Sequence, residues 1–219
     1  MQRQYREFRD KLAEGTILLF RLGDFYEVFG HDAEVAAKVL GLTLTKRHET
    51  PMAGLPHHAA PAYVNRLLAA GWKVAICDQL EAPVAGKLVR RGLTRILTPG
   101  TALEDSQLDS RRGNYLAALC WDKQGWHAAW LDVSTADFRL ASDSSPSRLL
   151  PLLHSVSPRE IILPEGLEPS AADREALEVF LQGRAVSRLP GWNFDGAAGA
   201  RLVAQTLSVH GLAGFGLTD

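Results

Sequence analysis

The chain has 219 residues, of which 46% are hydrophobic and 22% are charged, and its formal net charge is −1 at pH 7. These proportions are ordinary for a soluble globular protein, and the length predicts one or two domains. No apolar run approaches the roughly 18 to 20 residues of a membrane span, so the sequence indicates no membrane segment. Residues 1–6 contain no apolar signal core, which leads us to expect a cytoplasmic protein.

A net charge close to zero argues against strong DNA binding, because DNA affinity comes largely from phosphate neutralisation by Lys and Arg. The basic residues are nevertheless grouped, at residues 46–48 and 87–95. A nearly neutral chain with such local groups can bind DNA weakly and gain further affinity from other domains or from a partner subunit.

The cysteines and histidines of the chain are not spaced as a metal site or as a catalytic nucleophile and its base. The two cysteines, Cys77 and Cys120, lie inside apolar runs, and we predict that both are reduced core thiols. The adjacent His57 and His58 point apart if they lie in a strand, and no acid or cysteine stands at ligand spacing. We therefore expect neither a metal site nor a catalytic residue.

Residues 1–103 alternate helical and strand-like patterns, which predicts a first domain of mixed α/β structure. Apolar spacing predicts helices at residues 2–13, over about ten residues ending before Gly41, and at residues 60–70. Strands are predicted at residues 16–22, 42–45, 73–79 and 94–98. We expect residues 46–51 to form a polar loop, and residues 51–56, which contain two prolines and a glycine, to be rich in turns.

Residues 104–113 are polar and charged, and we predict that they form a linker to a second domain at residues 114–219. Three strands are predicted first, at residues 115–121, 126–133 and 137–141, with a tight hairpin at residues 122–125. Helices at residues 148–155, 171–181 and 197–209 then alternate with strands at residues 161–163 and 185–189. Antiparallel strands followed by helix–strand repeats predict a second α/β domain.

The segment from Arg21 to Phe29 carries the strongest functional signal. It places Phe25 and Glu27 two residues apart, just after the apolar run at residues 17–20. Residues two apart in a strand point to the same face, so the ring and the carboxylate can reach one target together. An aromatic ring can stack on a base or wedge between bases, and a carboxylate can accept a hydrogen bond from a base edge. The pair suits a protein that tests whether a DNA base pair is sound.

The run Leu22-Gly23-Asp24-Phe25-Tyr26-Glu27-Val28-Phe29 resembles the mismatch-recognition motif of the MutS family of bacterial mismatch repair proteins. Blocks at residues 42–47, 51–56, 74–79, 97–101 and 114–118 are similar to the same family and occur in the same order. The resemblance is strong through Asp137 and looser afterwards. It implies a mixed-sheet α/β mismatch-recognition domain, followed by a connector domain with an RNase H-like α/β fold.

The resemblance also implies roles for individual residues. Phe25 is expected to act as a wedge in the minor groove and Glu27 as the acceptor for a base edge. Leu22 and Asp24 flank Phe25 and are expected near the DNA backbone, although Asp24 can equally serve to fix the turn. The remaining expected DNA contacts are Lys46, Arg47 and Met52.

Each of those three contacts has a plainer alternative. Arg47 is implied to bind a phosphate, which positions a protein without reading sequence. Lys46 and Arg47 are equally compatible with a solvated turn. Met52 either packs beside the wedge in the minor groove or fills a gap in the core.

Proteins of this family continue into clamp and ATPase domains, and the sequence contains no GxxxxGK[ST] phosphate loop. We therefore expect a non-enzymatic fragment without a cofactor, since ATP and Mg²⁺ belong to the full-length family proteins. The resemblance implies a dimer for the full-length protein, and a MutL-type partner on the connector domain, with Arg201 and Gln205 as candidate contacts. By itself the chain is expected to show weak mismatch selectivity, because bending DNA costs energy.

Two other functions stay open at this point. An RNase H-like nuclease needs several carboxylates around Mg²⁺, and Asp132 with Asp137 or Glu160 would have to supply them. The other alternative is a scaffold whose connector surface binds protein partners only.

Overall fold

The computed structural model describes residues 2–81, 89–101 and 113–217. The chain divides into two compact units, one formed by Met1–Tyr115 with Asp132–Asp137, and the other by Leu116–Leu131 with Phe138–Asp219. The predicted linker at residues 104–113 lies almost wholly outside the described residues. Within the described ranges, no helix combines the length and the apolar character needed to cross a membrane.

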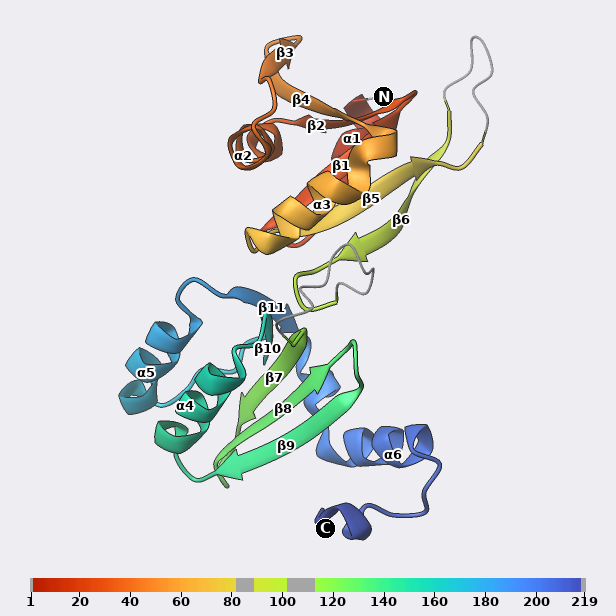
Figure 1. Cartoon of the computed structure of the whole chain (residues 1–219). Helices are drawn as coiled ribbons and strands as arrows, with labels where there is room; N and C mark the ends of the chain where they lie inside the picture. The colour runs from red at the N-terminus through yellow and green to blue at the C-terminus, as the bar shows by residue number, and fades with distance from the viewer. Residues whose placement is uncertain (1, 82–88, 102–112, 218–219) are drawn as a thin grey trace. The chain divides into compact units, whose positions relative to one another are not determined.

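The first unit is a six-stranded mixed sheet with helices on both faces (Figure 1). Its elements in chain order are α1 (Gln2–Arg9), β1 (Thr16–Leu22), β2 (Phe25–Phe29), α2 (His31–Leu40), β3 (Thr45–Arg47), β4 (Thr50–Pro56), α3 (Ala60–Ala69), β5 (Lys73–Gln79) and β6 (Arg91–Leu97). The strand order is β3-β4-β2-β1-β5-β6, in which only β1 and β5 run parallel. The predicted mixed α/β class is confirmed.

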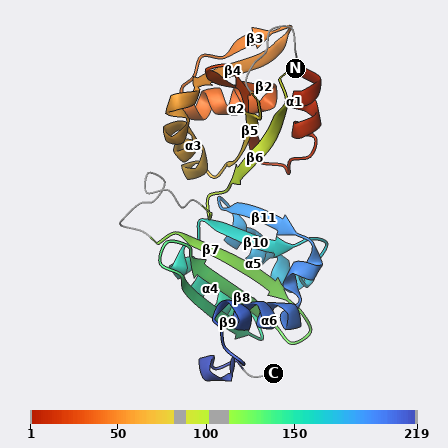
Figure 2. The same cartoon turned by 90° about the vertical axis from the view of Figure 1, so that its right-hand side faces the viewer.

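The two faces of this sheet are covered differently. Helices α2 and α3 pack on one face, over a core that includes Tyr26, Val28 and Leu55. Helix α1 lies on the opposite side of β5 and β6 from α3 (Figure 2). It packs over a smaller cluster around Phe20 and Phe29. Part of the second face therefore has no helix over it among the described residues.

Helix α1 is fixed to the sheet by a few specific contacts. The Tyr5 hydroxyl donates to the Phe29 carbonyl at 3.3 Å, and the rings of the two residues meet edge to face at 4.9 Å. Arg9 pairs with the buried Asp32 at 3.1 Å. Burial raises the pKa of Tyr5 above its usual range, with the Asp32 charge as the second cause.

Three sequence predictions in the first unit are wrong. The strand predicted at residues 42–45 is instead β3, which contains Lys46 and Arg47, and the supposed turns at residues 51–56 belong to β4. The loop consists of His48 and Glu49, with φ of 47° and 64°, as a two-residue hairpin turn requires. The first helix also ends earlier than predicted, at Arg9, because the chain turns before Gly15, whose φ is positive.

The second unit is a five-stranded sheet with the order β11-β10-β7-β8-β9. Its elements are β7 (Tyr115–Trp121), β8 (Trp126–Asp132), β9 (Asp137–Asp143), α4 (Pro146–Val156), β10 (Glu160–Pro164), α5 (Ala171–Leu181), β11 (Ala185–Leu189) and α6 (Gly196–Thr206). Strand β10 pairs parallel with β7 and β11, whereas the arrows of β7, β8 and β9 alternate in direction (Figure 1). Helices α4 and α5 lie on one face and α6 on the other (Figure 2).

Counted from β7, the strand order of the second unit is 3-2-1-4-5. This arrangement is the α/β fold that the resemblance predicted for the second domain, and the prediction is confirmed. The last helix was predicted at residues 197–209 but ends at Thr206.

Candidate nucleic-acid interface

Strand β2 begins directly after a two-residue turn. Leu22 pairs with Phe25, so Gly23 and Asp24 alone connect β1 to β2. Gly23 has a φ of 59°, which the first position of such a turn favours and which a glycine adopts without strain. The backbone of His57 donates to the Asp24 carbonyl at 2.9 Å and closes the turn from the far side. Phe25 is thereby presented at the very start of a well-paired strand.

Phe25 and Glu27 lie on the same face of β2, as the sequence predicted, while Tyr26 and Val28 point into the opposite core. The Phe25 side chain is 50% exposed. On β4, Pro56 pairs with Phe25 and Gly54 pairs with Glu27, and Gly54 has no side chain to cover the carboxylate. A Cβ added there would lie 4.0 Å from the Phe25 ring. The result is an open patch with an aromatic ring and a carboxylate on it.

Arg47 completes this patch from the edge of the sheet. Its Nη1 donates to Glu27 Oε2 at 3.0 Å, with the Glu27 side chain 19% exposed and the Arg47 side chain 41% exposed. Strand β4 separates the two residues, and the register places them on one face. Sequence reasoning named both residues but missed their contact, because it placed Arg47 in a loop. We call Phe25, Glu27, Gly54 and Arg47 the open patch.

The other predicted DNA contacts lie outside the open patch. Lys46 alternates to the opposite face of β3 and pairs with Glu49 at 3.5 Å. Leu22 and Met52 are half-buried and pack against the cluster beneath α1, which favours the core role for Met52. Asp24 is exposed at the turn. That these four residues touch DNA stays a prediction.

A polar contact on the other face holds β2 in place. Tyr26 donates from its hydroxyl to Asp78 Oδ1 at 2.6 Å, and Thr94 donates to Asp78 Oδ2 at 2.9 Å. Burial, and secondly the bond to Asp78, raises the pKa of Tyr26 above its usual range. Because this contact reaches across β1 to β5, it restrains the strand that carries the open patch. Sequence analysis did not predict it.

The carboxylate proposed for a nuclease, Asp132, has a structural role at the end of β8. Asp132 Oδ1 accepts from the backbone N–H of Ser134 at 2.9 Å and from its hydroxyl at 2.6 Å. These bonds, led by the hydroxyl, lower the pKa of Asp132. Within the residues described, no three His, Cys, Asp or Glu side chains are grouped as metal ligands. Nothing in this geometry supports Mg²⁺-dependent cleavage.

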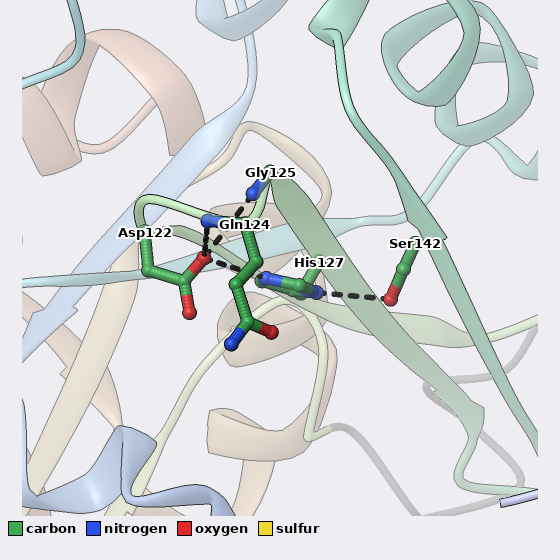
Figure 3. A network of polar contacts seen from close by, with 5 residues as sticks. All are labelled: Asp122, Gln124, Gly125, His127 and Ser142. Atoms are coloured by element: carbon green, nitrogen blue, oxygen red, sulfur yellow. Dashed lines mark hydrogen bonds and ion pairs between the residues drawn. The ribbon is translucent and has the colours of Figure 1, made fainter.

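His127 lies between Asp122 and Ser142 (Figure 3), but its Nε2 faces the carboxylate and its Nδ1 the hydroxyl, the reverse of a serine-hydrolase triad. His127 bridges Asp122 Oδ1 at 3.2 Å and the Ser142 hydroxyl at 2.9 Å. The same Asp122 oxygen accepts the backbone N–H groups of Gln124 and Gly125, at 2.7 and 3.2 Å. Those donors close the β7–β8 hairpin and do not point at a substrate oxygen, as an oxyanion site requires. The hydrogen bond from His127, followed by that from Gln124, lowers the pKa of Asp122.

Comparison with known proteins accounts for both units. The family model for MutS domain I matches residues 1–106, and that for MutS domain II matches residues 114–219. The chain belongs to the MutS family. The family resemblance seen in the sequence is therefore confirmed, and it extends over the second unit, where the motifs were weaker.

Individual MutS relatives match along the whole chain. Proteins named DNA mismatch repair protein MutS from Myxococcus xanthus and Chlorobium limicola are 38% and 41% identical, each over 100% of this chain and 25% of the relative. The protein of that name from Symbiobacterium thermophilum is 41% identical over 99% of this chain and 26% of its own length. The chain thus spans about a quarter of the length of the MutS relatives it matches.

Proposed function

We propose that this chain recognises mismatched or unpaired bases in duplex DNA for mismatch repair, with Phe25 inserted from the minor groove and Glu27 accepting a hydrogen bond from the displaced base. The observation that carries the proposal is the exposed ring of Phe25, held at the start of β2 beside a carboxylate. Membership of the MutS family supports it, because the relatives described above are named DNA mismatch repair proteins.

Stacking energetics favour a damaged site over an intact one. Base–aromatic stacking contributes about 1–3 kcal/mol per base and tolerates any base. Inserting a wedge unstacks a base step and kinks the duplex, which costs a few kcal/mol. A mismatched or unpaired base has already lost pairing energy, so the same distortion costs less there. Discrimination therefore comes mainly from the weakness of the DNA and needs no code for individual bases.

Glu27 adds a second distinction between the two kinds of duplex. A carboxylate near phosphates is electrostatically unfavourable unless something compensates for its charge. A displaced base offers a hydrogen-bond donor to Glu27, whereas a base in an intact pair uses that edge for its partner. The carboxylate thus acts against binding to sound DNA.

The strand that carries the ring suits this role because it is restrained before DNA arrives. Strand β2 is paired on both sides, with β1 and β4, and Tyr26 bonds to Asp78 beneath it. A side chain on a rigid strand loses little conformational freedom on binding.

An NMR titration of the 15N-labelled 219-residue chain tests the proposal. One duplex carries a single unpaired thymine and the other is fully paired, both at low salt. We expect shifts at Phe25, Glu27 and Gly54 and a small preference for the first duplex, which Phe25→Ala removes. Phe138→Ala is the matched control, because Phe138 is also an exposed phenylalanine, 43% accessible, but lies on β9. The proposal would be contradicted if Phe25→Ala kept the preference for the duplex with the unpaired thymine. Chemical-shift changes confined to other surfaces would contradict it as well.

Docking of a MutL-type partner on the second unit is a further part of the proposal. Helix α6 buries none of its residues, and both Arg201 and Gln205 on it are exposed. A pull-down with a MutL protein tests this, with Arg201→Glu expected to weaken retention. Assembly of the full-length protein as a dimer is proposed on the family relationship alone.

A further inference from the structure

The ion pair between Glu27 and Arg47 occupies the group that the proposed function assigns to a base. Glu27 Oε2 already accepts a hydrogen bond from Arg47 Nη1 at 3.0 Å. The carboxylate is mostly covered, at 19% side-chain exposure, while the guanidinium remains 41% exposed. A base that bonds Glu27 therefore competes with Arg47 for the carboxylate charge, at Oε2 or at the neighbouring Oε1.

We propose that the Glu27–Arg47 pair is exchanged on mismatched DNA: the displaced base takes the Glu27 carboxylate, and Arg47 transfers to a backbone phosphate. This inference rests on the proposed function of Phe25 and Glu27. It makes Arg47 a residue that determines specificity, beyond positioning the domain.

The position of Arg47 suits such an exchange. It ends β3, a three-residue strand at the edge of the sheet whose partner is β4. Partly exposed ion pairs are weak, so replacing the carboxylate by another anion is not opposed by a strong contact. A guanidinium binds phosphate oxygens in the same two-pronged geometry that it uses for carboxylates.

The exchange distinguishes two duplexes because only one of them supplies a new partner for Glu27. On fully paired DNA, Arg47 either stays on Glu27 and makes no phosphate contact, or moves and leaves the carboxylate unneutralised beside the phosphates. On mismatched DNA both charges are satisfied. The complex with mismatched DNA therefore contains one phosphate contact more.

The number of phosphate contacts is measurable from the salt dependence of binding, which steepens by about 0.9 in log–log slope for each contact on duplex DNA. For the wild-type 219-residue chain we expect a slope steeper by about 0.9 with a duplex carrying an unpaired thymine than with the fully paired duplex. Dissociation constants come from NMR titrations at several salt concentrations.

Three variants separate the exchange from a plain phosphate contact. In Glu27→Gln, Arg47 reaches a phosphate in both complexes, so the two slopes become equal at the steeper value. In Arg47→Gln, the slopes become equal at the shallower value. Lys46→Gln is the matched control: Lys46 lies on the same hairpin but pairs with Glu49, so the difference between duplexes persists.

An experiment without DNA checks the starting state. Rotation of the Arg47 guanidinium, followed by NMR of its side-chain nitrogens, is expected to be slowed in the wild type and faster in Glu27→Gln. Equal slopes in the wild type with a mismatch preference that Phe25→Ala still removes would overturn the exchange and leave recognition standing. Absence of any Phe25-dependent preference would instead remove the proposed function.

Discussion

Phe25 and Phe29 are the same amino acid on the same face of the same strand, yet their surroundings are opposite. Phe29 is 7% exposed and meets the Tyr5 ring of α1, whereas Phe25 is 50% exposed at the other end of β2. The difference lies in the reach of α1, which covers the sheet around Phe29 and leaves the part around Phe25 uncovered. One strand thus supplies both a core residue and a candidate DNA wedge.

The largest expected effect that follows from this comparison concerns stability. Phe29→Ala should lower the free energy of unfolding by about 3–5 kcal/mol, because it removes a buried ring and leaves a cavity. Phe25→Ala, the matched control, should change it by no more than about 0.5 kcal/mol. Urea unfolding of both variants measures the difference. A large loss of stability in Phe25→Ala would mean that its ring belongs to the core.

Alkaline pH should produce the next largest effect, through Tyr5 and Tyr26. Both have a pKa raised in the folded state, mainly by burial. Above the ordinary tyrosine pKa of about 10, the unfolded chain loses these protons while the folded chain keeps them, so stability is complete below about pH 10 and falls as pH rises. Above pH 10, each tyrosine lowers the free energy of unfolding by about 1.4 kcal/mol per pH unit.

Urea unfolding between pH 9 and pH 11 measures this loss. Tyr5→Phe should remove the contribution of one tyrosine from the fall in unfolding free energy with pH. Tyr26→Phe should remove the contribution of the other. If both variants keep the pH dependence of the wild type, groups other than these tyrosines cause it.

The smallest expected effect sharpens the comparison at Gly54. Its φ lies outside the left-handed region, and an added Cβ would make only ordinary contacts with Phe25 and the Tyr26 carbonyl. Gly54→Ala should therefore raise the free energy of unfolding by about 0.4–1 kcal/mol, because it restricts the unfolded chain. Thermal unfolding checks this value. Gly23→Ala is the contrasting variant, since Gly23 has a φ of 59°, and it should destabilise the chain.

Much of the first unit could be predicted because its inner strands are apolar runs. Residues 16–22 and 73–79 were predicted as strands and are β1 and β5, which pair with each other inside the sheet. Strand β4 was missed because Pro51 and Gly54 are common in turns. In the structure Pro51 pairs with Lys46 near the start of the strand, and Gly54 belongs to the open patch.

Only part of the candidate site could be predicted from the sequence. The spacing of Phe25 and Glu27 identified the strand face that they share. The exposure of Phe25 depends on how much of the sheet α1 covers, and the contact between Glu27 and Arg47 depends on the order β3-β4-β2. Both are tertiary relationships between residues distant in the chain, and local patterns do not contain them.

The two-residue turn between β1 and β2 has a consequence for how this protein can vary. Side chains alternate strictly along a strand. Inserting or deleting a single residue within Gly23–Asp24 would therefore shift the register of β2 against β1 by one residue and move each of its side chains to the other face. Tyr26 and Val28 would then leave the core beneath α2 and α3, and Phe25 with Glu27 would be driven into it. Amino-acid replacements at the turn change its strain, whereas a change of its length would invert the strand and abolish fold and recognition together.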